Sequence, residues 1–577
     1  MSASNNKKLR KELNAAAMTE KQLKEQQEAK KLKVYTLTFA VVMVLVVAIV
    51  IGVVVSPLIE GAIRSNSHAV TIGEHELTAA DLTYFYIDSI TEHQNQVYNQ
   101  YYSTFGNYWS MMLGYEPTKA LNKQVYNKDT GETWADFFVN QAIDSAKAAY
   151  ALYDEGMANN YKLTETEQDK IDTYLDSLDM YAAYYSYSNV KSYLRATYGN
   201  GANERDYGEY YTVCAYASSY YTKYKNDLKY DVEDYRAYEK GTDEVSRFND
   251  YSTFSYFTHA FDYTTYLGEG TKGENGTTTW TDAEKEAARA AMKADMLQLT
   301  ASGIIDKESF DKALQELKIY KYDKDGNPVA DDKKKTATEV KDTFYPSVTL
   351  RTEAKEWLGE TERVNGDFKC FEYVSYAAHE DSNHTHSAEC GCASTVDGYT
   401  FVLFVGRNDN TMNMVNVRHI LVKFTGGTQD SNGNVTYSDA EKATAKTEAE
   451  KLLKQWQDGK ANEESFGELA NKESDDLNGK VTNGGLYEDV CPGQMTKGFE
   501  DWCFAEGRKA GDTGIIETEY GYHVMYYSST DPMTYRDYMI DTNMRAEDAE
   551  KWHEDLTKKI AFTKVDLSHM ELDLVVG

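Results

Sequence analysis

The stretch NVRHILVKF, from Asn416 to Phe424, has the composition of a buried strand that carries one titratable residue. Apolar and β-branched residues favour strands, and successive side chains of a strand point to opposite faces. This alternation predicts that His419 shares a face with Val417 and Leu421. The other face then carries Arg418, Ile420, Val422 and Phe424. His419 is either a core histidine with satisfied ring nitrogens or part of a functional site, and this stretch alone leaves both readings open.

The same strand opens the second copy of an internal repeat. Two segments, TDAEKEAARAAMKADMLQL from Thr281 and SDAEKATAKTEAEKLLKQW from Ser438, both begin with a capping box that starts a helix. Each is followed by a second short helix with a shared Ser-Phe pair, from Asp306 and from Asn462. Matched segments in a constant order indicate a repeated structural unit.

Further matches carry the repeat to its end. The segment KEWLGETERVNGD from Lys355 aligns without gaps with EDWCFAEGRKAGD from Glu500, and the copies close with GYTFVLF and GYHVMYY. The first copy is expected to open with the strand FSYFTHAFDY from Phe254. The pattern predicts two tandem strand–helix–helix–helix–strand–strand units, over residues 246–412 and 413–530, and hence an α+β fold class.

A membrane-spanning segment is predicted near the N-terminus. Residues 34–55 are 22 consecutive residues without a charge, about the length that a bilayer core needs. They follow a segment rich in basic residues, among them Lys7, Lys8, Arg10, Lys11, Lys30, Lys31 and Lys33. The positive-inside rule predicts that residues 1–33 are cytoplasmic, that 34–56 form an uncleaved single-pass anchor, and that the remainder is extracytoplasmic. A cleaved signal peptide is the alternative, but SPLIEGAIRS offers no small-residue cleavage site.

The region between the anchor and the repeats is predicted to be helical. Residues 67–245 are expected to begin with a short strand, Ala69 to Ile72, and a helix capped at Thr78, followed by amphipathic helices. One of these starts with the capping box Thr164–Glu167. The C-terminal segment 531–577 contains a further amphipathic helix, which is expected to pack back on the helical domain.

Composition narrows the class of partner. The net charge of -32 argues against nucleic acid as a partner and fits a soluble exported protein. The 47 tyrosines either fill a half-wet core or provide a surface that holds unfolded chain segments. Six cysteines in 577 residues do not make a disulfide framework.

Five ordered motifs of the second copy resemble the parvulin (PpiC-type) family of peptidyl-prolyl cis/trans isomerases. They are RHILV, NGG, PGQM, FEDW and YGYHV, which begin at Arg418, Asn483, Pro492, Phe499 and Tyr520. The resemblance implies a small antiparallel sheet covered by helices in each repeat. The helical domain and the C-terminal helix are similar in layout to the chaperone part of bacterial extracytoplasmic foldases that carry parvulin domains.

The implied chemistry needs no nucleophile, metal or cofactor. Rotation of an X–Pro bond breaks amide resonance, with a barrier of about 18–20 kcal/mol. A site catalyses it by gripping the proline ring and favouring the twisted amide, whose carbonyl carries less negative charge. An apolar cup with a few polar groups is expected to suffice.

The resemblance assigns roles to individual residues. Met495 and Phe499 are expected to form the cup, and His419 and His523 to be paired on neighbouring central strands. Asp476 is expected near the rotating carbonyl, and Thr518 matches a hydroxyl position before the last strand. The family pattern Gly-Gly-Asp-Leu-Gly is altered here. Gly484-Gly485 is followed by Leu486-Tyr487-Glu488, so that Tyr487 stands where a leucine would line the pocket and Leu486 adjoins it.

The first copy is expected to keep the fold without the site. The alignment places Ala354 at the Phe499 position, Leu350 at the Met495 position and Thr400 at the His523 position, while His259 is a candidate match for His419. An insertion in this copy carries His384, His386, Cys390 and Cys392, four residues of the types that bind Zn²⁺. The alternatives are a surface loop with incidental histidines and a Cys-x-Cys pair that oxidises.

The sequence leaves two functions open. The first is a membrane-anchored extracytoplasmic foldase whose second repeat isomerises X–Pro bonds of newly exported polypeptides. The second is a non-catalytic holdase or assembly chaperone, in which the helical domain and both repeats only bind unfolded chains.

Overall fold

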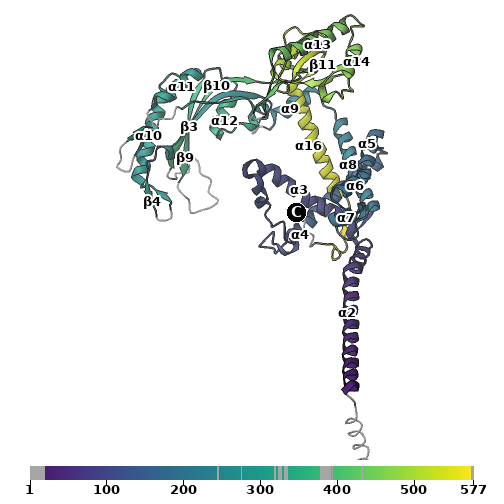
Figure 1. The fold of residues 1–577 in the computed structure, drawn as a ribbon. Helices are drawn as coiled ribbons and strands as arrows, with labels where there is room; N and C mark the ends of the chain where they lie inside the picture. Colours follow the sequence, from purple (N-terminus) through teal and green to yellow (C-terminus); the bar gives the residue numbers. More distant parts are fainter. Residues whose placement is uncertain are drawn as a thin grey trace, which may run out of the picture. The chain divides into compact units, whose positions relative to one another are not determined.

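The computed structural model describes residues 20–242, 246–273, 276–317, 320–322, 328–330, 335–376, 392, 394–430 and 433–572. The chain divides into two compact units, residues 1–228 with 545–577 and residues 229–544. Helices and sheets are both present, which agrees with the predicted α+β class (Figure 1).

The second repeat contains a four-stranded antiparallel sheet in the order β14-β11-β16-β15. Its strands are β11 (Asn413–Lys423), β14 (Leu486–Val490), β15 (Thr513–Glu517) and β16 (Gly521–Thr534). Helices α13 (Asp439–Gln457) and α14 (Glu463–Glu473) lie on one face, and the short helix α15 (Lys497–Cys503) packs on the other. Ser438 starts α13 with the predicted capping box.

The first repeat has a sheet of the same topology, in the order β8-β3-β10-β9. Its strands are β3 (Thr253–Asp262), β8 (Thr338–Phe344), β9 (Phe368–Tyr376) and β10 (Ser394–Asn408), and its helices are α10 (Asp282–Thr300), α11 (Lys307–Glu316) and α12 (Thr352–Gly359). Three two-stranded hairpins add to the repeats: β4 (Thr271–Lys272) with β5 (Thr278–Thr279), β6 (Tyr320–Tyr322) with β7 (Pro328–Ala330), and β12 (Thr428–Gln429) with β13 (Val435–Thr436).

Besides the hairpins, the main sheet of each repeat has one strand more than the sequence predicts. β8 and β14 are edge strands inserted before the third helix, so that the unit reads strand–helix–helix–strand–helix–strand–strand. β14 has the sequence LYEDV, in which two acidic residues interrupt any apolar alternation. An edge strand of this kind is held by backbone pairing on one side, which leaves little pattern in its side chains.

The alternation predicted for β11 is confirmed. Ile420, Val422 and Phe424 pack in the core formed with α13 and α14. Val415 and Val417 pack in a separate core with Phe499 of α15 and with β16. His419 lies on the second of these faces, because it follows Val417 by two residues.

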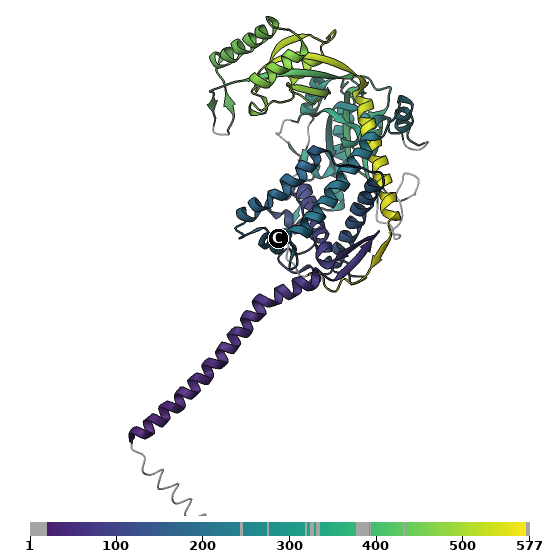
Figure 2. The same ribbon diagram turned by 90° about the vertical axis from the view of Figure 1, so that its right-hand side faces the viewer.

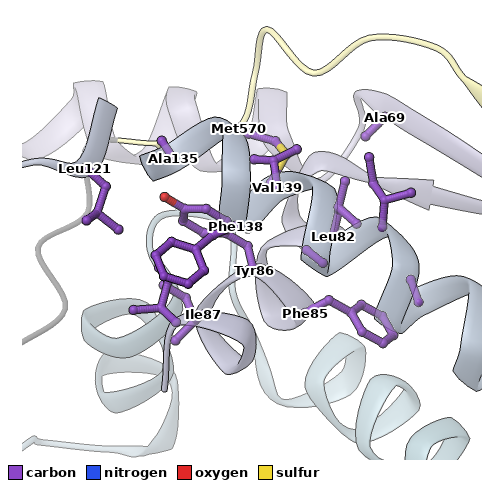
Figure 3. Close-up of a cluster of buried hydrophobic side chains, with 14 of the residues drawn as sticks. Ala69, Leu82, Phe85, Tyr86, Ile87, Leu121, Ala135, Phe138, Val139 and Met570 are labelled. Atoms are coloured by element: carbon purple, nitrogen blue, oxygen red, sulfur yellow. The ribbon is translucent and has the colours of Figure 1, made fainter. Parts of the chain in front are cut away.

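The helical unit is built on β1 (His68–Ile72), β2 (His75–Thr78), α3 (Ala79–Phe105) and α4 (Trp134–Ala158). Side chains from β1, α3 and α4 meet Met570 in one buried cluster (Figure 3). Shorter helices follow: α5 (Glu165–Asp176), α6 (Leu178–Tyr184), α7 (Val190–Tyr198) and α8 (Glu204–Asp227), with α9 (Val232–Lys240) in the second unit. Thr78 and Thr164 are N-caps with capping boxes, whereas β2 is absent from the sequence-based expectation.

The end of the chain belongs to the helical unit, as the sequence predicts. In α16 (Tyr535–Lys559), Trp552 stacks on Tyr224 of α8 with ring centroids 3.6 Å apart. β17 (Phe562–Lys564) then pairs antiparallel with β1, with Lys564 opposite Val70. The last strand of the chain therefore completes the sheet that its first strand begins.

Residues 34–55 fall within α2 (Glu20–Arg64), one long helix that Figures 1 and 2 show in purple. Considering only residues whose side chains the structure describes, it has no helix with the length and apolar character needed to span a bilayer. Residues 34, 35, 37, 47, 48 and 50–55 of the predicted anchor lie outside that described set.

Gly485 provides a test of the second repeat's packing. It has φ +64°, its carbonyl accepts a hydrogen bond from the His419 amide at 2.9 Å, and an added Cβ would lie 2.2 Å from the His419 carbonyl oxygen. We expect Gly485→Ala to destabilise the domain by at least about 3 kcal/mol, since backbone strain and a backbone clash add. Hydrogen exchange of the β11 amides measures this free energy.

Gly507→Ala is the matched control, because Gly507 has φ +81° and nothing within 4 Å of the position that a Cβ would take. The Gly507→Ala substitution should lower the free energy of unfolding of the domain by only about 1–2 kcal/mol. Equal losses in the two variants would contradict the packing described for Gly485.

Candidate functional site

The two central strands bring His419 and His523 together. In the β11–β16 ladder, Leu421 is opposite His523 and Met525 is opposite His419, so the two histidines are diagonal neighbours on one face. Their Nδ1 atoms are 3.0 Å apart and their rings stack with centroids 5.1 Å apart. Both side chains are buried, at 3% and 6% exposure for the residues.

Asp476 reaches this pair from the turn after α14. The turn is fastened to β11, because the Asp475 amide donates to the Leu421 carbonyl at 2.8 Å and the Leu421 amide donates to Ser474 Oγ at 3.1 Å. Asp476 Oδ2 then accepts hydrogen bonds from His419 Nε2 at 3.1 Å and from the Tyr487 hydroxyl at 2.9 Å. These donors, with His419 first in effect, hold the pKa of Asp476 well below its usual range.

The ionised carboxylate fixes the direction of the whole hydrogen-bond chain. A carboxylate only accepts, so His419 donates from Nε2, and with a neutral ring its Nδ1 is an acceptor. His523 must then donate from Nδ1, which leaves its Nε2 to accept from the Thr518 hydroxyl at 2.8 Å. Every donor in the chain therefore points toward Asp476.

The His523 imidazole is neutral at pH 7. Burial is the largest cause, with the neighbouring His419 second, and together they lower the pKa of His523 to about 3. With His523 neutral and protonated on Nδ1, its Nε2 can accept a hydrogen bond from the Thr518 hydroxyl.

An apolar cup lies beside the two imidazoles. Its cavity measures about 310 Å³ and is lined by His419, Leu421, Lys423, Asp476, Tyr487, Met495, Thr496, Phe499, Tyr520 and His523. Phe499 meets both histidines edge-on, with centroids 5.5 Å from His419 and 5.7 Å from His523. The volume and the mostly apolar wall suit a small ring such as that of proline.

The structure brings together most of the residues that the sequence singles out. Met495, Phe499 and Tyr487 line the cup with Asp476 and both histidines, and Thr518 lies behind His523. Leu486 is not among the lining residues, because neighbouring residues of β14 point to opposite faces and Leu486 pairs with Arg418 instead.

Four lining residues are absent from the sequence-based set: Leu421, Lys423, Thr496 and Tyr520. The signal for two of them was present, since Leu421 and Lys423 follow His419 at intervals of two along a predicted strand. Thr496 and Tyr520 lie in turns, where periodicity gives no guidance.

A comparison with protein families shows which family the second repeat resembles. The family described as PPIC-type PPIASE domain matches residues 399–529. The match begins in β10 of the first repeat and spans nearly all of the second, and the predicted resemblance to the parvulin family is confirmed.

Two curated relatives are foldase proteins named PrsA 1. The protein of Listeria innocua is 33% identical over 111 residues, covering 19% of this chain and 29% of that relative. The protein of Listeria monocytogenes is 28% identical over 163 residues, covering 27% of this chain and 47% of that relative. The chain thus spans less than half the length of the curated relatives it matches.

Solved structures of PrsA are also similar to parts of the chain. The Bacillus anthracis protein is 23% identical with a TM-score of 0.16, and the match covers 26% of this chain and 59% of that structure. The Bacillus subtilis protein is 20% identical with a TM-score of 0.17, and the match covers 28% of this chain and 54% of that structure.

The strand register corrects one expectation for the first repeat. In β3–β10, Val402 is opposite Thr258, as Met525 is opposite His419 in the second repeat. Thr258 therefore occupies the place of His419. His259 is one residue further on and points to the other face, where its ring contacts Phe261 at 5.6 Å.

A hollow of the first repeat, beside α12 and β9, has a different lining. It measures about 980 Å³, and its lining includes Ala354 and Thr400 at the positions aligned with Phe499 and His523. It is larger than the cup of the second repeat but has no imidazole in its described lining. Size alone is therefore a poor guide to the site in this chain, since the chemistry of the smaller cavity fits a prolyl ring better.

The suggested zinc ligands cannot be placed together. His384, His386 and Cys390 lie outside the described residues, and Cys392 is half-buried. Within the described part of the chain, no three residues of the metal-binding types gather into a candidate site. Zinc binding by the insertion stays a prediction.

The burial of His523 predicts an acid-sensitive domain. Its folded pKa is about 3 against 6.5 for the ordinary group, so the unfolded chain binds more protons as the pH falls below 6.5. Stability is therefore present above pH 6.5 and is lost toward pH 3, by about 2 kcal/mol between pH 7 and pH 5. Hydrogen exchange of the β11 and β16 amides at the two pH values measures this loss.

His523→Gln is the control, since glutamine does not titrate. The variant should lose about 2 kcal/mol less than the wild type over the same pH interval. The same pH dependence in both proteins would show that His523 does not carry the effect.

Proposed function

We propose that this chain is a peptidyl-prolyl cis/trans isomerase that acts as a membrane-anchored, extracytoplasmic foldase. The observation that carries the proposal is the cup of the second repeat, where Phe499 and Met495 stand beside a linked His419–His523 pair. The parvulin-type domain at residues 399–529 and the foldase relatives support it.

In the proposed reaction, Phe499, Met495 and Leu421 hold the proline ring of an X–Pro bond in the cup. The amide then extends toward Asp476 and the imidazoles. Twisting removes conjugation, so the carbonyl oxygen loses negative charge and the nitrogen becomes more basic. A mostly apolar cavity disfavours the more polar planar amide relative to the twisted one, which lowers the barrier.

The polar groups hold the geometry of the cup in this proposal. Asp476, His419, His523 and Thr518 form one chain in which each donor has an acceptor. Buried and satisfied networks of this kind are rigid. A rigid floor keeps Phe499 at the angle that grips the ring, and no covalent intermediate, metal or cofactor takes part.

The proposed substrates are unfolded or newly exported polypeptides that contain X–Pro bonds. The helical unit offers exposed apolar side chains that could hold such clients, including Tyr108 at 73%, Met111 at 78% and Tyr184 at 80% exposure. These side chains also favour the second candidate, a holdase that binds unfolded chains without catalysis.

A membrane anchor at residues 34–55 is proposed on the sequence and on the exposure of α2. Nine consecutive residues, 38–46, are exposed, so apolar side chains project from every side of the helix over more than two turns. Phe39 and Val44, for example, are 66% and 68% exposed. In water this surface would be unfavourable, whereas a lipid environment would cover it.

Phe499→Ala tests the isomerase. The full chain should accelerate isomerisation of a proline-containing peptide, measured by NMR exchange, and the variant should lose at least about tenfold in kcat/KM because the cup wall is gone. Circular dichroism establishes that the variant remains folded.

Phe371→Ala is the matched control, since Phe371 lines the larger hollow of the first repeat. It should keep wild-type turnover. Turnover that is the same in all three proteins, or absent from the wild type, would leave only the holdase.

Membrane fractionation tests whether residues 34–55 anchor the chain. The full chain should remain with membranes after carbonate extraction, and deletion of residues 34–55 should release it. The double variant Val44→Arg, Val46→Arg should weaken retention, since each arginine at the bilayer centre costs about 2.5–3.5 kcal/mol on insertion scales. Release of the wild-type chain by carbonate would contradict the anchor.

A further inference from the structure

Tyr487 is the residue at which the second repeat departs most clearly from the family pattern. An apolar side chain at this position could only line the cup. Tyr487 lines the cup and also donates its hydroxyl to Asp476 Oδ2 at 2.9 Å. The bond joins β14 to the turn after α14, two elements that the sheet ladder does not connect.

The turn that carries Asp476 packs little against its carboxylate, although the Leu477 backbone also hydrogen-bonds to it. Leu477 and Asn478 have φ of 48° and 56°, in the left-handed region, which asparagine adopts readily but leucine only at a cost. The Leu477 side chain is 62% exposed. Asp476 Oδ2 is instead held from two strands, by His419 of β11 and by Tyr487 of β14.

Tyr487 is itself well fixed. Its backbone is paired with Val417 in the β11–β14 ladder, and its ring meets the His419 ring edge-on with centroids 4.9 Å apart. Burial, with the bond to Asp476 second, raises the pKa of Tyr487 to about 12. The hydroxyl therefore keeps its proton at every physiological pH and remains a donor.

The first repeat provides an internal comparison. Val340 is opposite Tyr256 there, as Tyr487 is opposite Val417. The hydroxyl is thus missing from the copy that also has Thr258 and Thr400 in place of the histidines. The same sheet forms in both copies, so the fold does not require a tyrosine at this position.

We propose that Tyr487 is a positioning residue of the isomerase site, whose hydroxyl holds the Asp476 carboxylate against His419. This inference rests on the proposed function. With the carboxylate held, His419 keeps its proton on Nε2, and the orientation passes through His523 to Thr518. The ring of Tyr487 forms the wall of the cup, while the hydroxyl acts only through Asp476.

Isomerisation kinetics of the full chain with a proline-containing peptide test whether the ring and the hydroxyl of Tyr487 have these separate roles. Tyr487→Phe keeps the ring and removes the hydroxyl, so KM should stay within a factor of two while kcat falls about tenfold, the effect of one hydrogen bond to a charged group. In the background of Asp476→Ala, the same substitution should have no further effect on kcat.

Tyr522→Phe is the matched control. Tyr522 also donates to a carboxylate, Glu517 Oε2 at 2.8 Å, but its side chain packs in the core on the opposite face of the sheet. This variant loses the same kind of bond in the same domain and should retain wild-type kcat and KM. Thermal unfolding of each variant checks that the domain remains folded.

The outcomes separate the inference from the proposed function. An active wild type with unchanged kcat in Tyr487→Phe would overturn the positioning role alone. A kcat loss that persists undiminished in the Asp476→Ala background would also overturn it, because the hydroxyl would then act independently of Asp476. A wild type without turnover would overturn the proposed function and this inference together.

Discussion

The pairing of β11 with β16 is the constraint on which the site depends. It sets Leu421 opposite His523, and so leaves the His419 and His523 rings as diagonal neighbours with their Nδ1 atoms 3.0 Å apart. A slip of one residue in either strand would send that strand's histidine to the face covered by α13 and α14. The apolar pattern of β11 resists such a slip, since Ile420 and Val422 would leave the core at the same time.

The hydrogen-bond chain through both histidines to Thr518 starts from one anion, the Asp476 carboxylate. Asp476 lies at the rim of a mostly apolar cavity, and its carboxylate can only accept hydrogen bonds. With both imidazoles neutral, this gives each of them a single tautomer and gives the Thr518 hydroxyl a single direction of donation. The tyrosine at position 487 adds a second donor at the place where the charge resides. A leucine at this position, as in the family pattern, has no hydroxyl to donate. The site of this chain therefore has one hydrogen bond to Asp476 that the family pattern lacks.

Comparison of the two repeats shows which residues the fold requires and which residues only the site requires. Both have four strands in the same order, and both place a tryptophan, Trp357 or Trp502, in the third helix. Positions around the cup differ: Thr258, Val340, Leu350, Ala354 and Thr400 stand in the first repeat for His419, Tyr487, Met495, Phe499 and His523. Core residues tolerate apolar exchange when volume and pattern are kept. A linked imidazole pair survives no such exchange, since each ring needs the other as its partner.

The repeat, the α+β class and the faces of β11 could be predicted from the chain alone, and most of the cup from the resemblance of its motifs to the parvulin family. Periodicity and capping boxes are local, and the motifs from Arg418 to Val524 occur in a fixed order, so these features could be read from the chain. Tertiary structure decided the remainder. The edge strands β8 and β14 exist through backbone pairing, which leaves little trace in side-chain pattern. Register showed that Thr258, not His259, corresponds to His419, and that Leu486 faces away from the cup. The bond from Tyr487 to Asp476 joins two residues on either side of a loop, and only their folded positions bring the two oxygen atoms within 2.9 Å.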